Sequence, residues 1–113
     1  CARYSPDGKL LVTGGQDGIV RVWDATSHRE LRSLAGLANR ILDVTFSTDG
    51  HRLAACDGAA VLIWDTTSNW KQTDEWPAPT VRKIALGASG GLLMAGDRLW
   101  YRTPDRQSLD IRE

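Results

Sequence analysis

An internal repeat about 40 residues long restricts this chain to a small set of folds. The turn-like segment YSPDG begins at Tyr4 and returns as FSTDG at Phe46 and as LGASG at Leu86, offsets of 42 and 40 residues. A Trp-Asp pair that begins at Trp23 recurs at Trp64, 41 residues further on. The similar spacing of separate markers predicts three units laid end to end, each of which packs on its neighbours.

Each unit has the periodicity of short strands. In 19–22 apolar residues alternate with Arg21, and 41–46 reads as an apolar strand that enters a Ser-Thr-Asp-Gly turn. Gly, Asp and Asn follow the strands and permit the positive φ that tight hairpins require. In the second unit we expect strands near 40–46, 52–56, 61–65 and 70–74. Four antiparallel strands in each unit, packed face to face with the next unit, predict an all-β fold built from β-propeller blades.

Two stretches follow one pattern closely: SPDGKLLVTGGQDGIVRVWD at 5–24, and GLANRILDVTFSTDGHRLAACDG with VLIWD within 36–65. In these residues the chain resembles the WD-repeat (WD40-type) propeller family. The third unit is degenerate, with Trp100-Tyr101 in place of the Trp-Asp pair. The resemblance implies three blades, at 1–36 (truncated at its start), 37–76 and 77–113. They would form an open segment of a ring of about seven blades, closed by missing blades or by other copies of the chain.

The resemblance also implies structural roles for the residues that tie each blade together. The family uses a network of Trp, Ser or Thr, His and Asp, because a buried indole N–H and the turn groups must be paired. Five residues take these positions: Thr13, Asp17 and Trp23 in the first unit, and Asp57 and Trp64 in the second. In the second unit Leu37 replaces the His and Ala55 the Ser or Thr. The network therefore cannot form there as the family forms it.

Composition and charge exclude several classes of protein. The 14 basic and 14 acidic residues cancel, so we expect no nucleic-acid partner. No apolar run approaches the roughly 18 residues of a spanning helix, and we expect no membrane insertion. The only cysteines, Cys1 and Cys56, form neither a disulfide framework nor a zinc motif, which favours a cytoplasmic location. Because the chain begins on Cys1 in the middle of an expected strand, we expect a fragment.

Motifs for catalysis or cofactor binding are not found. His28 and His51 each sit in a polar turn and are expected to be exposed. The Gly-rich segment at 13–18 lacks the Lys-Ser/Thr of a phosphate loop, and no GxSxG or HExxH is present. Cys56 is expected to be an inert buried thiol. We therefore expect no cofactor, no metal and no catalytic residue in this segment.

Two tryptophans are not explained by the repeat. Trp70 and Trp76 belong to NWKQTDEWPAP at 69–79, which covers the expected outer strand and the loop after it. Packing on the rim of the blade is one interpretation of this segment. The other places Trp76, in a Pro-flanked loop, in a partner-binding or blade-to-blade contact.

The resemblance implies where partners would dock. In the family this is the face built from the loops before the first strand and between the second and third strands of each blade. Carried over, it comprises 37–40, 76–82, Gln16, Asp17, Asp57, Gly58 and Asp97. The partner-binding candidates are Gln16, Asn39, Arg40, Trp76 and Arg82.

The predicted function is a non-catalytic scaffold for protein–protein interaction, with loops of a rigid propeller presented to protein or peptide partners. Two alternatives stay open. One is the scaffold module of a larger signalling enzyme whose catalytic domain lies outside this segment, which the full reading frame would show. The other is a self-assembling structural fragment, which its mass in solution would show.

Overall fold

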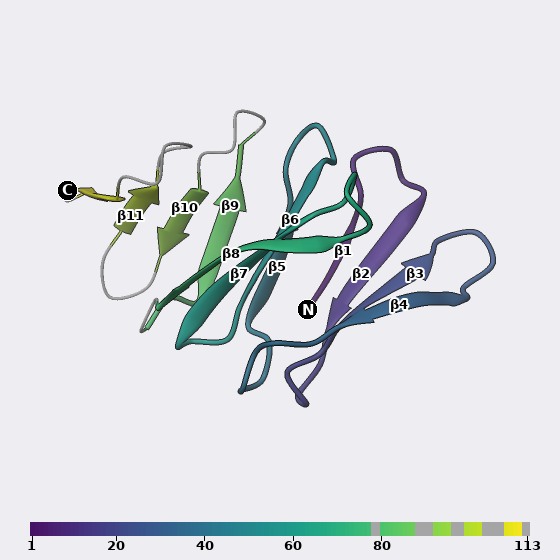
Figure 1. Ribbon diagram of the computed structural model, residues 1–113, viewed down its shortest axis with the longest axis horizontal. Coiled ribbons are helices and arrows are strands. Elements are labelled where there is room, and N and C mark those ends of the chain that lie inside the picture. Colours follow the sequence, from purple (N-terminus) through teal and green to yellow (C-terminus); the bar gives the residue numbers. More distant parts are fainter. Residues whose placement is uncertain (78–79, 88–91, 96–98, 103–107, 112–113) are drawn as a thin grey trace.

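The chain folds into three four-stranded antiparallel sheets, in each of which strand order follows chain order (Figure 1). The computed structural model describes residues 1–77, 80–87, 92–95, 99–102 and 108–111. Blade 1 consists of β1 (Ala2–Tyr4), β2 (Leu10–Gly14), β3 (Val20–Asp24) and β4 (Glu30–Leu34). Blade 2 consists of β5 (Asp43–Phe46), β6 (Arg52–Cys56), β7 (Ala60–Asp65) and β8 (Lys71–Pro77). Blade 3 consists of β9 (Lys83–Leu86), β10 (Leu92–Ala95), β11 (Leu99–Arg102) and β12 (Ser108–Ile111). The predicted all-β architecture of consecutive blades is confirmed.

The turn between the first two strands is built in the same way in blades 1 and 2. The Ser5 hydroxyl donates to Asp7 Oδ1 at 2.5 Å and accepts the Leu10 N–H at 3.0 Å. In blade 2 the Ser47 hydroxyl donates to Asp49 at 2.6 Å and accepts the N–H five residues on at 3.0 Å. The Gly that closes each turn has a positive φ, 74° in blade 1 and 76° in blade 2. The repeated Ser-x-Asp-Gly letters therefore encode one turn geometry.

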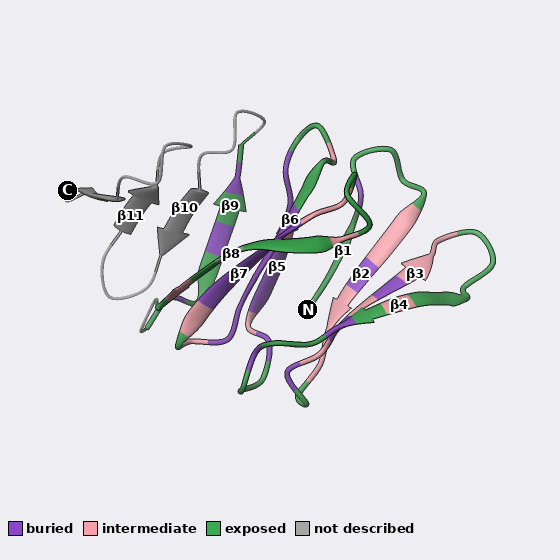
Figure 2. Ribbon diagram, in the orientation of Figure 1, coloured by how far each residue is buried: buried purple, intermediate pink, exposed green. Residues whose placement is uncertain are grey.

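Apolar packing joins each blade to the next. Blades 1 and 2 share a core that includes Val12, Val20 and Val22 from one side and Val44, Leu53 and Leu62 from the other. Blades 2 and 3 share a second core, which includes Ala54, Cys56, Val61 and Ile63 with Val81, Ile84 and Leu86. Figure 2 shows buried segments concentrated on β5, β6 and β7 of blade 2, between its two neighbours. Each buried Val or Leu side chain contributes about 1.5–3 kcal/mol, so the blades form one stiff framework.

One row of cross-strand neighbours is covered in blade 2 and open in blade 1. The row consists of Tyr4, Leu11 and Trp23 in blade 1 and of Phe46, Leu53 and Trp64 in blade 2. In blade 2 these side chains are 8%, 0% and 3% exposed, whereas Tyr4 is 66% exposed. Blade 1 covers the row of blade 2, and nothing in the described part of the chain covers the equivalent row of blade 1.

Strand bounds in blade 2 differ from the prediction at two places. β5 begins at Asp43 rather than near residue 40, and β8 runs from Lys71 to Pro77 rather than ending near residue 74. Trp76 therefore lies in a strand, and its predicted place in a loop was wrong. The strand is longer because it pairs with the whole of β7, with Trp76 opposite Val61 and Pro77 opposite Ala60. A Pro is tolerated there because β8 is the edge strand of its sheet.

The turn between β7 and β8 is held by the neighbouring blade. Asn69 and Trp70 have φ values of 57° and 58°, a left-handed backbone that is uncommon for a residue as bulky as Trp. Arg32 of β4 donates to the Asn69 carbonyl at 3.3 Å, and its guanidinium lies 5.5 Å from the Trp70 ring centroid. Trp70 in turn packs edge-on against Phe46, with ring centroids 6.3 Å apart. Contacts from blade 1 thus stabilise a turn of blade 2.

Candidate partner-binding face

Four connections gather at one end of the sheets, along the lower edge of Figure 1. They are the β2–β3 turn (15–19), the β4–β5 connection (35–42), the β6–β7 turn (57–59) and the described part of the β8–β9 connection (80–82). We call these residues the loop face. Gln16, Asn39, Arg40 and Arg82, four of the predicted partner-binding residues, lie on it with their side chains exposed. Asp97, also predicted for this face, lies outside the described residues.

Backbone hydrogen bonds fasten each connection to the preceding blade. The Ile41 N–H donates to the Gly15 carbonyl at 3.0 Å, and the Thr80 N–H donates to the Gly58 carbonyl at 3.0 Å. Gly18 has a φ of 78°, and a Cβ at this position would lie 2.6 Å from the carbonyl oxygen of Leu37. A side chain at residue 18 would push the connection away, so the close contact requires Gly.

Asp57 organises the junction between the β6–β7 turn and the β4–β5 connection. Its carboxylate is 6% exposed and accepts five hydrogen bonds. Oδ1 accepts the N–H groups of Ala59 and Ala60, each at 2.9 Å. Oδ2 accepts the N–H groups of Ala38 and Asn39 at 3.2 and 3.1 Å, and the Asn39 side-chain amide at 3.3 Å. One carboxylate therefore fixes two loops.

The electrostatics of Asp57 follow from these bonds. Burial raises the pKa of the carboxyl, but hydrogen bonds from the backbone of its own turn and of the 38–39 segment outweigh burial, and the pKa lies below its usual value. Leu37 stands where the family has His, and the bonds from residues 38 and 39 supply the donors in its place. Sequence reasoning assigned Asn39 only to partner binding and missed this internal bond.

Asp17 occupies the equivalent position in blade 1 but is exposed. It pairs with Arg21 at 2.9 Å and accepts the Ile19 N–H at 3.1 Å. The hydrogen bond from the Arg21 side chain, with that from Ile19, holds the Asp17 pKa below its usual value. Arg21 also pairs with Glu30 at 3.3 Å. Two carboxylates of blade 1, those of Asp17 and Glu30, thus share one arginine.

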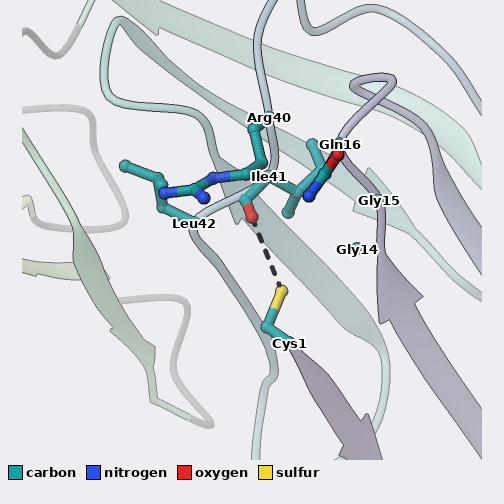
Figure 3. A pocket seen from close by; sticks show the side chains of 7 residues that line it. All are labelled: Cys1, Gly14, Gly15, Gln16, Arg40, Ile41 and Leu42. Atoms are coloured by element: carbon teal, nitrogen blue, oxygen red, sulfur yellow. Dashed lines mark hydrogen bonds between the residues drawn. The ribbon is translucent and has the colours of Figure 1, made fainter.

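A pocket of about 410 Å³ lies at the junction of blades 1 and 2 (Figure 3). Its lining consists of Cys1, Gly14, Gly15, Gln16, Arg40, Ile41 and Leu42. A Cβ at Gly14 would lie 2.4 Å from Ile41 Cγ2, so this glycine lets the two blades approach. Gln16 comes from the β2–β3 turn and Arg40 from the β4–β5 connection. Two residues that are 24 positions apart in the sequence thus line one pocket.

The Trp residues of the repeat have different surroundings in the two blades. In blade 1 the Trp23 indole N–H donates to the Thr13 hydroxyl at 3.0 Å, the pair implied by the family network. In blade 2 Ala55 stands at the position of Thr13 and offers no hydroxyl to Trp64, which is 3% exposed. Apolar packing therefore replaces the polar tie in blade 2.

Trp76 contacts a neighbouring blade. It is half-buried in β8 and packs against the core shared by blades 2 and 3, which includes Val81. This is the blade-to-blade contact that was one part of the predicted role. Partner binding by Trp76 stays a prediction.

Asp43 was missed by sequence reasoning. This residue of β5 is 5% exposed and lies between the neighbouring blades. Its Oδ2 accepts the Ile84 N–H of blade 3 at 3.0 Å, and its Oδ1 lies 3.7 Å from the Arg3 guanidinium of blade 1. The interruption of the apolar run ILDVTF by an Asp was the available signal.

The described residues offer little for catalysis or metal binding. His28 and His51 are exposed in turns at the end of the sheets opposite the loop face. Burial, with smaller effects from Asp43 and Asp57, raises the pKa of the Cys56 thiol to about 12, which disfavours the reactive thiolate. Within the described residues no three His, Cys, Asp or Glu side chains gather to hold a metal ion. No apolar helix of membrane-spanning length occurs there either.

Comparisons with curated proteins give relatives that are much longer than this chain. Periodic tryptophan protein 2 of Arabidopsis thaliana is 35% identical over 101 residues, which cover 85% of this chain and 11% of that protein. Small ribosomal subunit protein RACK1 of Schizosaccharomyces pombe is 33% identical over 105 residues, which cover 93% of this chain and 31% of that protein. The chain thus spans less than a third of the length of either relative.

Solved structures and a family model agree on the fold. The β-propeller domain of Cps50 (Swd1) from Myceliophteria thermophila has a TM-score of 0.85 at 24% identity, covering 99% of this chain and 37% of that one. The WD40 repeats of RRP9 have a TM-score of 0.84 at 19% identity, covering 98% of this chain and 36% of that one. The family model "WD domain, G-beta repeat" matches residues 1–24 and 28–65, more than half of the chain. With three sheets arranged as propeller blades, the chain belongs to the WD-repeat (WD40-type) β-propeller family.

Proposed function

We propose that this chain is a non-catalytic interaction module that presents the loop face to peptide or protein partners. WD-repeat propellers are generally non-catalytic and generally bind proteins, which supports the class of function. The observation that carries the proposal is the pocket that is lined by Gln16 of blade 1 and by Arg40 of the β4–β5 connection. Two polar side chains from different blades in one concave site are suited to hold a partner side chain.

The rigidity of the loop face supports the same function. Asp57 holds two of its loops with five hydrogen bonds, and the Ile41 and Thr80 N–H groups bind the connections to the preceding blades. Loops that are already ordered lose little conformational freedom when a partner binds. The binding energy is then available for contacts with Gln16 and Arg40.

The proposal is tested by quantitative co-purification of the intact natural protein with its cellular partners. The test variant is Gln16→Ala with Arg40→Ala. The matched control is Thr48→Ala with Arg29→Ala, which also removes one neutral polar side chain and one arginine, both exposed at the opposite end of the sheets. Circular dichroism and the thermal midpoint verify that both variants fold.

We expect the test variant to lose at least one partner that the control retains. Retention of every partner by the test variant would overturn the proposal. Equal losses from both variants would overturn it as well, because the partner would not depend on the loop face.

A further inference from the structure

The first strands of the three sheets and the connections that lead into two of them carry an excess of positive charge, although the whole chain is neutral. β1, β5 and β9 are the first strands of their sheets, and with the connections 35–42 and 80–82 they contain four cations and one carboxylate. The cations are Arg3, Arg40, Arg82 and Lys83, and the carboxylate is Asp43. These segments together carry three more positive than negative charges, although the net charge of the whole chain is zero.

Asp43 does not neutralise the cations of the loop face. It is 5% exposed, and its oxygens accept the N–H groups of Val44 and Ile84, each at 3.0 Å. Among the described residues, Asp43 forms an ion pair with Arg3 at 3.7 Å. The Arg3 Nε also donates to the Val44 carbonyl at 3.2 Å. The charges of Arg3 and Asp43 are therefore paired with each other between blades 1 and 2.

The two aspartates of the loop face already have partners within the chain. Asp17 pairs with Arg21 at 2.9 Å, and Asp57 is saturated by five N–H donors. The side chains of Arg40, Arg82 and Lys83 are exposed, and within the described part of the chain they have no ion pair. Asp57 keeps its negative charge, but it is 6% exposed and its oxygens face the N–H groups that they accept. The exposed charged side chains of the loop face that have no ion pair are therefore the cations Arg40 and Arg82, and Lys83 follows them at the start of β9.

We propose that the partner segment bound by the loop face is an acidic peptide, an inference that rests on the proposed function. One carboxylate binds Arg40 at the pocket, and a second binds Arg82 or Lys83 on the adjoining blade. A guanidinium matches a carboxylate with two parallel hydrogen bonds, and the Gln16 amide adds a donor at the same pocket.

The arrangement of the cations favours a peptide over a nucleic acid. Nucleic-acid affinity depends on many phosphate contacts and on aromatic side chains that stack on bases. Within the described residues, Arg40, Arg82 and Lys83 are the cations of these segments without an ion pair, and Tyr4, which is strongly exposed, lies on the open row of blade 1 rather than on the loop face. A pocket of about 410 Å³ accepts one or two peptide side chains.

The test measures fluorescence anisotropy of labelled probes bound to the intact natural protein. The probes are a ten-residue peptide of alternating Glu and Gly, the same peptide with Gln for Glu, and a ten-nucleotide oligouridine. The variants are Arg40→Gln and Arg82→Gln. Arg29→Gln and Arg52→Gln, exposed at the opposite end of the sheets, are the matched controls.

We expect the Glu peptide to bind more tightly than the Gln peptide. The affinity for the Glu peptide should fall roughly tenfold with Arg40→Gln or Arg82→Gln, and the control variants should leave this affinity unchanged. Binding should also weaken as salt is raised. Three results would each overturn the proposal of an acidic peptide partner. They are tighter binding of the oligouridine than of the Glu peptide, equal affinities for the Gln and Glu peptides, and no binding of the Glu peptide. In those cases, partners that co-purify through Gln16 and Arg40 would leave the proposed function standing, so the two failures are distinguishable.

Discussion

Blades 1 and 2 share turn geometry and strand pairing but stabilise equivalent positions by different chemistry. In blade 1 the Trp23 indole is tied to Thr13, whereas Trp64 in blade 2 is packed beside Ala55. The row that contains Trp64 is covered by blade 1, and the row that contains Trp23 is open. Blade 1 thus has a polar tie at its Trp, and blade 2 holds its Trp by packing against blade 1. The same position of the repeat is stabilised by a hydrogen bond in one blade and by apolar contacts in the next.

The aspartates show the complementary contrast. Asp17 is exposed and forms an ion pair with one arginine, whereas Asp57 is buried and accepts hydrogen bonds from five N–H groups. A side-chain ion pair at the surface contributes little, while a buried carboxylate with several donors organises the backbone around it. Blade 2 has thus lost the His and the Ser or Thr of the family network, yet its Asp makes more hydrogen bonds than the equivalent residue in blade 1.

The largest expected effect is on the shared row. Leu53→Ala should lower the free energy of unfolding by roughly 2–5 kcal/mol, because it opens a cavity at a side chain that is 0% exposed. The equivalent change in blade 1, Leu11→Ala, should cost about 1 kcal/mol, because Leu11 is already half-exposed. Urea unfolding of this 113-residue chain measures both. Equal costs would mean that blade 1 is covered as completely as blade 2.

Removing the carboxylate of Asp57 should have the next largest effect. Asp57→Ala leaves the donors of two loops without an acceptor, and we expect a loss of roughly 2 kcal/mol in the free energy of unfolding. Hydrogen exchange at the Ala38, Asn39, Ala59 and Ala60 amides should become faster. Asp17→Ala is the control and should cost less in the same unfolding experiment. A larger loss for Asp17→Ala would contradict the contrast between the two turns.

A smaller effect is expected at the Trp23 tie. Thr13→Val keeps the shape of the side chain but removes the acceptor of the indole N–H, which lies 3.0 Å away. We expect a loss of about 1 kcal/mol and a shift in Trp fluorescence. Thr13→Ser retains the hydroxyl and should recover most of the stability. If Ser were no better than Val, the methyl group rather than the hydrogen bond would account for the loss.

The smallest effect concerns pH. Because the pKa of Asp57 is lower in the folded chain, its ionised form contributes stability above the unfolded pKa of about 3.9, and this contribution is lost as pH falls through the folded value. The difference in unfolding free energy between the natural protein and Asp57→Asn should hold from pH 7 to about pH 4 and shrink below it. Urea titrations at several pH values measure the difference. A difference that grows below pH 4 would reverse the assigned direction of the pKa.

The fold was predictable because its signals are local. The strand at Arg52–Cys56 was placed correctly and the next strand to within one residue, since turn residues and alternating apolar residues mark both. Trp76 was misplaced because Pro77 and Pro79 resemble loop signals, whereas the pairing of Trp76 with Val61 that extends β8 is a contact between segments. The resemblance grouped the connections that the structure brings to one end of the sheets, and their role in partner binding stays a prediction. That Gln16 and Arg40 line one pocket depends on how two blades pack, which no single unit of the sequence contains.

The turn at Asn69 and Trp70 has a consequence for how such a chain assembles. In a repeat array, stability divides into what each unit contributes alone and what each boundary between units contributes. Arg32 belongs to blade 1, so the left-handed pair in blade 2 is stabilised by a boundary contribution. Blade 2 taken alone would keep its hairpin sequence but lose the contact that favours this turn. Which blade precedes blade 2 therefore matters for this turn. A blade moved to another place in an array would keep its strands but would lose the contacts that stabilise the turn.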